Sequence, residues 1–590
     1  MKKLLLLMCG LFIGVMANAQ TIVSGTVVDD AEQPLVGASV VVPGTTQGTS
    51  TDLGGNFEMK LRDGASQIQI SYLNYKTQTL DVDTKVPRQK FGMIKMESDA
   101  IAMDDVVITQ SLAVQRRTPV AVSTVEASEI EFKLGGQEFP EVLKSTPGVY
   151  VTKDGGGYGD SKINMRGFKS ANVAVMVNGV PVNDMEWGGV YWSNWAGLSD
   201  VTRSMQTQRG MGASKISSPS VGGTINIVTN SIDAKKGGTF SYGVGNDGLQ
   251  QLSLSLSTGL TEKGWAASVL FAKRWGDGYI QGTGFEGYNW FVNVSKRIND
   301  DHQLSLTAFG APQKHNQRKP LYAGLSIEGW NEVAKWTGEK NKYRYNAIYG
   351  FDNNGKERSS MVNEYHKPQI SLNHQWQIDY KSSLSTALYV SIGRGSGYSG
   401  QGRTSADRAM WNGSSNGQLL YNFRKTDGTF DYGAIQDMNA ASADGSRMVM
   451  SKSLNNHMWY GLLSTYTNEL LPGLELSAGV DVRYYVGEHT NEIIDLYDGA
   501  YFIDDGDRKN VKVENNIAAA DPNWKYEKLG VGDVVYRDYD GHVHQEGAFA
   551  QLEWTKNKVN AFVSGSVSNT GYWRVDRFYY DAAHQRSKTM

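Results

Sequence analysis

The chain has 590 residues, of which 40% are hydrophobic and 20% charged, and its formal net charge is -3. This length exceeds that of one ordinary domain, and the charge balance favours neither a nucleic-acid partner nor a basic membrane-surface protein. With 66 Gly, 30 Tyr and 14 Trp, the composition favours a mainly β protein. No apolar run beyond the N-terminus reaches the roughly eighteen residues of a membrane-spanning helix, whereas the strands of a membrane β-barrel are only half apolar.

The N-terminus predicts export. A basic start, an apolar stretch and the small-x-small triplet Ala17-Asn18-Ala19 identify residues 1–19 as a signal peptide, with Gln20 opening the mature chain. The single cysteine, Cys9, lies inside this signal. We therefore expect the exported chain to contain neither a disulfide nor a thiol nucleophile.

Residues 20–98 alternate between apolar and polar positions in about seven short strands, separated by Gly, Pro and Asp turns, which predicts a small β-sandwich. The most distinctive positions are Gly25, Pro34, Leu35, Gly37, Ala38, Gly44, Thr45, Thr51, Asp52, Gly55 and Phe57. With them the segment resembles the carboxypeptidase-regulatory-like domain found at the N-terminus of bacterial outer-membrane receptors. The resemblance implies a non-catalytic spacer, and a specific regulatory contact is the alternative. No histidine precedes His302, so a histidine metal site is not expected here.

Residues 113–232 predict a compact α+β domain. Residues 127–149 have helix-compatible spacing, and short apolar strands follow them. The ordered motifs are Pro147-Gly148-Val149, INMRGF at 163–168, VNGVPV at 177–182, Arg209-Gly210 and GGTINIVT at 222–229. In this order they resemble the plug domain of TonB-dependent outer-membrane receptors. The resemblance implies a plug signature at Arg166, Gly167, Asn178, Gly179, Pro181, Arg209, Gly210, Gly222 and Gly223.

Three parts of the signature carry physical expectations. Residues 179–181 (Gly-Val-Pro) are expected to form a tight turn between two apolar strands. Gly222 and Gly223 suit a close backbone approach where a plug strand meets a barrel wall. For Arg166 we expect a structural ion pair, with ligand contact as the alternative.

Residues 238–590 contain repeated segments of alternating apolar and polar residues, such as QQLSLSLSTGL, YNWFVNVSK and QISLNHQWQI. A membrane barrel and a soluble sandwich both alternate in this way. Very short connections take turns with connections of about sixty residues after Phe309, Ile392 and Tyr485, which is typical of the turns and outer loops of a membrane barrel. We expect aromatic girdles at the strand ends, at Trp265, Trp275, Trp459, Tyr484 and Trp554.

The strand count predicts a partial transmembrane antiparallel β-barrel. About eleven strands fit before residue 568, whereas plugged transporters have about twenty-two. An open sheet in lipid would leave about ten backbone groups unpaired at several kcal/mol each. The pattern therefore indicates the N-terminal half of a longer receptor in the outer membrane.

The segment MDDVVITQS, residues 103–111, lies between the sandwich and the plug. Its β-branched core suits pairing with a strand of another protein. It resembles the TonB box, which implies TonB of the TonB–ExbB–ExbD complex as partner and Asp104, Asp105, Val106, Val107, Ile108 and Thr109 as the contact residues. The alternative is that it forms the last strand of the sandwich.

The resemblance implies energy-coupled uptake of a scarce nutrient such as a siderophore or cobalamin. A glycan importer of the same superfamily and a non-transporting binding protein are the alternatives. Trp187, Tyr191, Trp192 and Trp195 are candidates for ligand stacking or for packing against the wall. We expect no enzyme activity and no cofactor, because the motifs indicate a plug and a barrel rather than a nucleophile, an acid/base pair or a metal cluster. We also expect no metal site, because residues 542–544 (His-Val-His) are expected to be ordinary loop residues. Outer-membrane lipid and a surface lipoprotein are further expected partners.

Overall fold

The computed structural model describes residues 21–590, with gaps at 30–31, 44, 46, 62–64, 73–74, 97–119, 154–157, 160, 196, 211–219, 320–323, 505, 511–520, 557–558, 582 and 590. The chain divides into two compact units, residues 1–107 and 108–590. The predicted signal peptide and the predicted TonB box lie outside the described residues.

The first unit is a β-sandwich. Its strands are β1 (Ile22–Val28), β2 (Ser39–Val41), β3 (Gly48–Ser50), β4 (Asn56–Lys60), β5 (Gln67–Ser71), β6 (Gln78–Asp81) and β7 (Arg88–Lys95). They form two sheets in the orders β4-β1-β7 and β3-β2-β5-β6, and β1 and β7 run parallel. Val23, Val27, Ile68 and Ile70 are buried between the sheets, because alternate strand residues face the same side. The predicted sandwich is confirmed.

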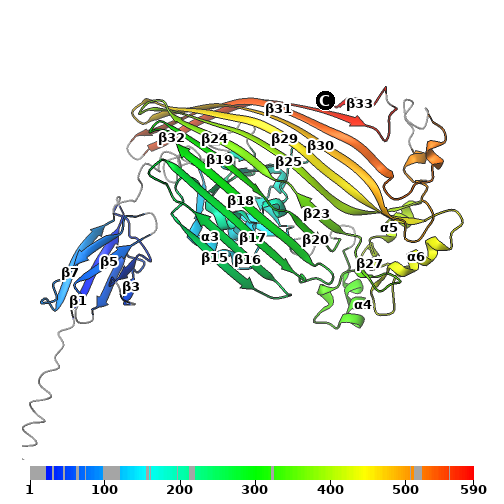
Figure 1. The fold of residues 1–590 in the computed structure, drawn as a ribbon, viewed down its shortest axis with the longest axis horizontal. Helices are drawn as coiled ribbons and strands as arrows, with labels where there is room; N and C mark the ends of the chain where they lie inside the picture. Colours follow the sequence, from blue (N-terminus) through cyan, green and yellow to red (C-terminus); the bar gives the residue numbers. More distant parts are fainter. Residues whose placement is uncertain are drawn as a thin grey trace, which may run out of the picture. The chain divides into compact units, whose positions relative to one another are not determined.

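The second unit begins with a small α+β domain, the plug, drawn in cyan in Figure 1. Its elements are β8 (Val122–Glu126), α3 (Ala127–Leu134), η1 (Phe139–Ser145), β9 (Val149–Thr152), β10 (Lys162–Met165), η2 (Ser170–Asn172), β11 (Val173–Val177), β12 (Val180–Pro181), η3 (Trp192–Trp195), η4 (Leu198–Val201), β13 (Thr202–Arg209) and β14 (Gly223–Thr229). A five-stranded sheet in the order β12-β11-β14-β13-β8 forms its centre, and β9 and β10 form a hairpin.

The helix-compatible segment forms two short helices rather than one. The α-helix α3 ends before Gly135, whose φ of 48° stops the helical run. The chain then restarts as the 3-10 helix η1, where Glu138 and Glu141 form a capping box and Pro140 lies in the first turn.

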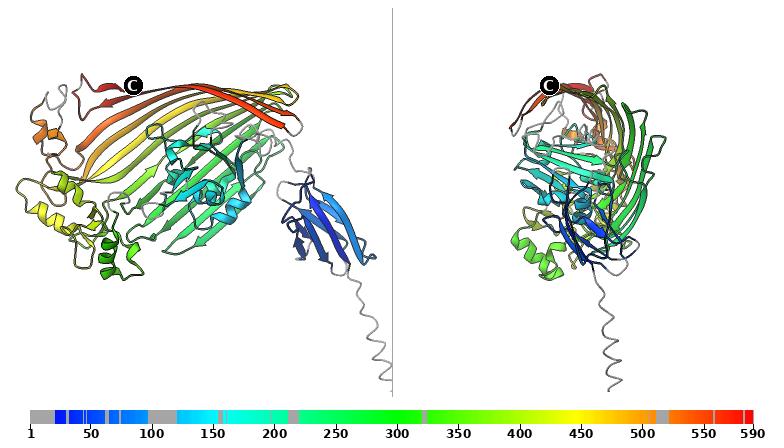
Figure 2. Two further views of the ribbon diagram at one scale, coloured as in Figure 1. Left: turned by 180° about the vertical axis from the view of Figure 1, so that it is seen from behind. Right: turned by 90° about the vertical axis from the view of Figure 1, so that its left-hand side faces the viewer.

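A large curved antiparallel sheet, the wall, follows the plug. Along its main path the strands are β15 (Gly237–Val244), β16 (Gln250–Ser257), β17 (Trp265–Gly276), β18 (Phe285–Arg297), β19 (His302–Gly310), β24 (Gln369–Gln377), β25 (Ser382–Gly402), β29 (Met448–Leu471), β30 (Leu474–Asp495), β31 (Val534–Lys556), β32 (Val559–Asp576) and β33 (Arg586–Thr589). Two further strands, β20 (Gln313–Asn316) and β23 (Val362–His366), pair with each other and with β18 and β25. Figure 2 shows the plug lying in the concavity of this sheet. The predicted mainly β fold with a partial barrel is confirmed.

The two faces of the wall have opposite character, as strand β24 illustrates. Ile370 and Leu372 on its outer face are 44% and 40% exposed, whereas Gln369 and Ser371 on its inner face are 0% and 2% exposed. Exposed apolar and buried polar side chains invert the arrangement of a water-soluble sandwich. An outer face of this kind fits a lipid environment, with the polar inner face covered by the plug.

One predicted girdle residue is wrong. Trp459 is only 4% exposed and belongs to the core between plug and wall, while its neighbours Met458 and Tyr460 face outward. Successive residues of a strand point to opposite faces, so an aromatic residue in a strand reaches the membrane interface only at outward positions.

The connections after Ile392 and Tyr485 are shorter than predicted, because β25 continues to Gly402 and β30 to Asp495. With the connection after β20, they contain short elements: α4 (Ile327–Thr337), η5 (Lys342–Arg344), β21 (Gly350–Phe351), β22 (Glu357–Arg358), α5 (Ser405–Met410), β26 (Ser414–Ser415), β27 (Gln418–Leu419), β28 (Phe430–Asp431), α6 (Tyr432–Ala440), η6 (Arg508–Asn510) and η7 (Trp524–Tyr526). Among the described residues, every strand within these three connections has only two residues. Within this same part of the chain, no helix combines the length and apolar character needed to cross a membrane.

Candidate ligand site between plug and wall

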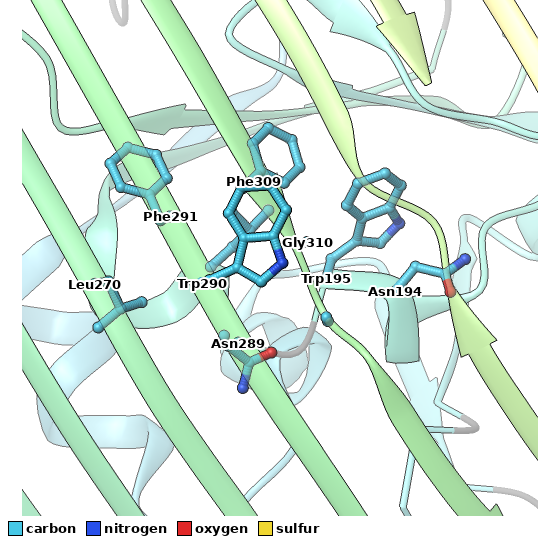
Figure 3. A pocket seen from close by; sticks show the side chains of 11 residues that line it. Asn194, Trp195, Leu270, Asn289, Trp290, Phe291, Phe309 and Gly310 are labelled. Carbon is cyan, nitrogen blue, oxygen red and sulfur yellow. The ribbon is translucent and has the colours of Figure 1, made fainter. Parts of the chain in front are cut away.

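An apolar contact joins the plug to the wall. Figure 3 shows Trp195 of η3 beside Phe309, Phe291 and Leu270, which project from β19, β18 and β17. The rings of Trp195 and Phe309 lie 5.5 Å apart, and Trp195 is 5% exposed. Trp192, also on η3, is 2% exposed and packs edge-on against Phe139. Trp195 therefore joins the plug to the wall, Trp192 packs within the plug, and both side chains are too buried to offer a face to a ligand.

The other two aromatic candidates are exposed. Trp187 and Tyr191 are 43% and 53% exposed, and their ring centroids lie 4.8 Å apart. Gly189 makes this arrangement possible, because a Cβ at this position would lie 1.9 Å from the indole of Trp187. Together the two rings offer an apolar platform suited to stacking.

This platform borders a cavity of about 300 Å³ between the plug and the inner face of the wall. Its lining consists of Gly159, Ser161, Lys162, Ser170, Trp187, Val190, Tyr191, Ser193, Asn194, Gln313, His315, Gln317, Asn363 and Tyr365. Gln313 is 5% exposed, and its Oε1 lies 2.5 Å from Nδ1 of His315 while its Nε2 has no hydrogen-bond partner. An unpaired buried donor at a cavity wall is suited to a ligand oxygen.

The loop that carries Trp187 is fixed at several points. Asn183 accepts a hydrogen bond from the backbone N–H of Val175 at 2.7 Å. Glu186 accepts one from the hydroxyl of Tyr485 at 3.2 Å and lies 2.7 Å from Nε2 of His489, both on β30. Burial raises the pKa of the Asp184 carboxyl, and the charge of Lys367 opposes this shift. The platform is thus anchored to the wall by polar contacts.

A buried ion pair joins the other side of the plug to the wall. Glu138, which is 2% exposed, lies 3.5 Å from Nη1 of Arg274 on β17. Arg274 also donates to the carbonyls of Gly136 and Gln137 at 2.5 and 3.2 Å. Burial raises the pKa of Glu138, and the charges of Arg274 and Lys153 oppose this shift.

Replacing Arg274 with Gln is expected to destabilise the plug by about 3 kcal/mol at neutral pH, because a buried carboxylate loses its partner. The pKa of Glu138 is higher in the folded state than in the unfolded state, so the native state holds the proton more tightly. Stability therefore falls as the pH rises from the unfolded-state pKa to the folded-state pKa. Losing Arg274 raises the pKa of Glu138 further, and the defect should be smaller at about pH 5 than at about pH 7.5. Thermal unfolding at both pH values measures this difference, with Lys335→Gln as the surface control. An equal defect at both would contradict a role for the charge.

The plug signature contains a turn one residue earlier than predicted. Asn178 and Gly179, with φ of 51° and 80°, join β11 to β12, whereas Val180 and Pro181 already belong to β12. A two-residue hairpin turn of type I′ needs positive φ at both positions, which Asn-Gly accepts most readily. The side chain of Asn178 also bonds Thr229 Oγ1 at 2.9 Å and so connects the turn to β14.

The glycine pair makes its close approach inside the plug and not against the wall. A Cβ on Gly222 would lie 2.5 Å from the carbonyl oxygen of Asn172, and one on Gly223 would lie 2.3 Å from that of Gln208. The prediction that these glycines face the wall is therefore wrong. The central position of β14 between β11 and β13 explains the crowding.

The two arginines of the plug signature, Arg166 and Arg209, make different contacts. Arg209 donates to the carbonyl of Pro147 at 3.0 Å. Arg166 is exposed with φ of 53°, next to Gly167 with φ of 83°, and a Cβ on Gly210 would lie 2.2 Å from its guanidinium. Among the described residues Arg166 has no ion-pair partner, so the expected structural ion pair is not found there.

The two histidines placed in a loop by sequence reasoning lie on strand β31 instead. His542 stacks on Trp573 at 4.8 Å and lies 2.9 Å from the hydroxyl of Tyr484. His544 is 3.6 Å from Glu546. In the described part of the chain, no group of three or more metal-ligating side chains gathers at one point.

Sequence reasoning did not identify Gln313, Glu186 or His489 as site residues. Gln313 and His489 come from strands more than a hundred residues after the plug loop, and no local pattern distinguishes them from other polar inner-face residues. Their proximity follows only from the seating of the plug.

Fold and site together define a plugged sheet, in which a compact domain fills the concave side of a sheet whose outer face is apolar. The CarboxypepD_reg-like domain family matches residues 23–108, and the TonB-dependent Receptor Plug Domain family matches residues 114–224. With both domains in this order, the first part of the chain is similar to the TonB-dependent receptors of the outer membrane.

Similar proteins span this group. The chain is 30% identical over 190 residues to TonB-dependent receptor SusC of Bacteroides thetaiotaomicron, covering 31% of this chain and 18% of that protein. It is 31% identical over 255 residues to vitamin B12 transporter BtuB of Vibrio cholerae, covering 43% and 38%. The ferripyoverdine receptor of Pseudomonas aeruginosa shares the fold with a TM-score of 0.52 at 14% identity, covering 96% of this chain and 63% of that one. The match to ferric citrate transporter FecA has a TM-score of 0.52 at 13% identity, covering 80% and 59%. The chain thus spans less than two thirds of these relatives.

Proposed function

We propose that the protein takes part in TonB-coupled uptake of a scarce nutrient across the outer membrane, without chemistry on the ligand. The observation that carries this proposal is the seating of the plug. It covers the polar inner face of a wall whose outer face is apolar and exposed. A passive pore needs no such domain.

TonB is the proposed partner, through residues 104–109 between the first unit and the plug. Asp104 and Asp105 precede the β-branched run Val106-Val107-Ile108, which favours an extended backbone. Addition of a strand from a periplasmic partner would attach that partner reversibly to the segment before the plug, so that a pulling force could reach the plug. ExbB, ExbD and a surface lipoprotein are proposed as further members of the assembly.

The cavity beside Trp187 and Tyr191 is the proposed ligand site. Its only ionic side chain is Lys162, and its other polar side chains are mainly neutral amides and hydroxyls. This chemistry supports a second candidate beside siderophores and cobalamin, a neutral oligosaccharide. Amides bond sugar hydroxyls, and aromatic faces stack on sugar rings.

Transport in cells that possess or lack the TonB protein tests the proposal. Radiolabelled ferric citrate, ferripyoverdine, vitamin B12 and neutral oligosaccharides are supplied to both strains expressing the receptor. Accumulation of one of them only when TonB is present is the expected result. Equal accumulation in both strains would establish a passive pore instead.

Replacing Trp187 and Tyr191 together with Ala is expected to weaken binding of the transported ligand about 10- to 100-fold, because a stacking platform is removed. The fold should persist, since both side chains are exposed. Titration calorimetry of the purified receptor measures the change. Tyr380→Ala, at a position 87% exposed in a short turn, is the matched control. Unchanged affinity in the double variant would show that the ligand binds elsewhere on the protein.

A further inference from the structure

A groove of about 640 Å³ lies on the wall at the end nearer the long connections. Its lining consists of Glu286, Tyr288, Pro312, Gln313, Lys314, Glu364, Tyr365, His366, Arg394, Gly395, Ser396, Lys452, Leu454 and Asn456. Most of these side chains belong to the outer face. On β25, Leu388 and Ile392 are exposed outward, and Arg394 continues the same alternation two residues later.

The groove begins where the apolar band of the outer face ends. In register, Glu286 lies opposite Lys314, and Lys314 lies opposite Glu364. One row nearer the band, His366 lies opposite Arg394. The next outward residue on β25 in that direction is the apolar Ile392. The charged rows thus mark the level at which lipid tails give way to headgroups.

Two neighbouring strand interruptions hollow the surface at this level. Pro312 separates β19 from β20, and Pro368 separates β23 from β24. Proline removes a backbone donor and so breaks the ladder. Because β19 pairs with β24 and β20 with β23, both breaks fall at the same height. Small Ser396 on β25 leaves room beside them.

The groove carries free positive charge. Lys314, Arg394 and Lys452 have neither an ion-pair nor a side-chain hydrogen-bond partner among the described residues. Glu286, in contrast, is paired with Lys273 at 2.9 Å. Glu364 offsets part of the charge, and the sum remains positive. Three cations that find no partner within the protein at a membrane interface are suited to an external anion.

We propose that this groove binds the phosphorylated headgroup of an anionic glycolipid of the outer leaflet. Phosphate oxygens accept hydrogen bonds from the guanidinium of Arg394 and the ammonium groups of Lys314 and Lys452. The ring of Tyr288 and the side chain of Leu454 border the same groove. Acyl chains attached to the headgroup then lie along the exposed apolar residues of the outer face.

Native mass spectrometry of the full chain, extracted gently from outer membranes, tests this proposal. The test variant combines Lys314→Gln, Arg394→Gln and Lys452→Gln. The matched control combines Lys335→Gln, Lys340→Gln and Lys356→Gln, which removes equal charge from exposed connection residues. Retained phosphorylated glycolipid should fall at least about tenfold in the test variant and stay unchanged in the control. Equal retention in both variants overturns the proposal. Circular dichroism of both variants shows that the wall is folded.

Reconstitution separates lipid from free anion. Delipidated receptor is mixed with micelles that contain a phosphorylated acylated disaccharide, the same lipid after phosphatase treatment, or inorganic phosphate in lipid-free detergent. Binding of the phosphorylated lipid alone is the expected result. Equal binding of the dephosphorylated lipid, or displacement by inorganic phosphate at the same concentration, overturns the assignment.

Discussion

Deleting residues 104–109 is expected to reduce ligand uptake to background while ligand binding at the cell surface stays unchanged. The segment would lose four or five main-chain hydrogen bonds to TonB at about 1 kcal/mol each. A loss of about 4 to 5 kcal/mol weakens the contact roughly a thousandfold or more. Binding and uptake of the same radiolabelled ligand are measured in whole cells, with the proton gradient of the inner membrane intact or dissipated. This comparison separates the two steps.

A single-residue pair sharpens this test. Val107→Pro removes the backbone N–H that strand addition requires, whereas Val107→Ile keeps it along with the β-branched side chain. Uptake should fail in the first variant and persist in the second. Normal uptake by the proline variant would mean that the segment is only part of the preceding sandwich.

Replacing Gly223 with Val is expected to destabilise the plug by more than about 3 kcal/mol, enough to unfold a marginal domain. Gly223 adopts a φ of 136°, which a β-branched residue does not tolerate. A Cβ would also lie 2.3 Å from the Gln208 carbonyl oxygen and 2.4 Å from the sulfur of Met165. Both neighbours belong to packed plug strands, and neither the backbone nor the fully buried Met165 can yield at low cost.

Calorimetry of the receptor in detergent measures the effect as a lower unfolding temperature of the plug. Gly565→Ala is the matched control, because a Cβ at Gly565 on β32 meets no atom within 4 Å. That variant should unfold at the temperature of the parent protein. A Gly223 variant with an unchanged transition would show that the strand can shift, and would contradict the close approach described here.

Local pattern was sufficient to predict the wall. Its strands alternate residue by residue, as in β24, and the alternation of short and long connections distinguishes it from a soluble sandwich. Where the strands end was not readable, because β25 and β30 continue past the apolar band with polar residues on both faces. The domain boundaries at residues 98, 113 and 232 stay predictions.

The aromatic loop shows why the site was only partly predictable. Trp187, Tyr191, Trp192 and Trp195 are chemically alike in sequence, and a Gly-rich loop has no period that assigns a face to each. Burial is decided by the neighbouring wall: Phe309 covers Trp195, while nothing covers Tyr191 to the same extent. Such contacts join residues more than a hundred positions apart, beyond the range of any local signal.

The unequal lengths of the wall strands set how far the protein reaches from the cell. Strand β29 has 24 residues and β16 has 8. At about 3.3 Å per residue and a tilt of about 45°, β29 rises roughly 55 Å, twice the apolar band of about 25 Å. The helices and short strands it supports stand clear of the bilayer on a stiff ladder of hydrogen bonds. We therefore expect them to be the part of the molecule that is most accessible to large molecules in the surrounding medium.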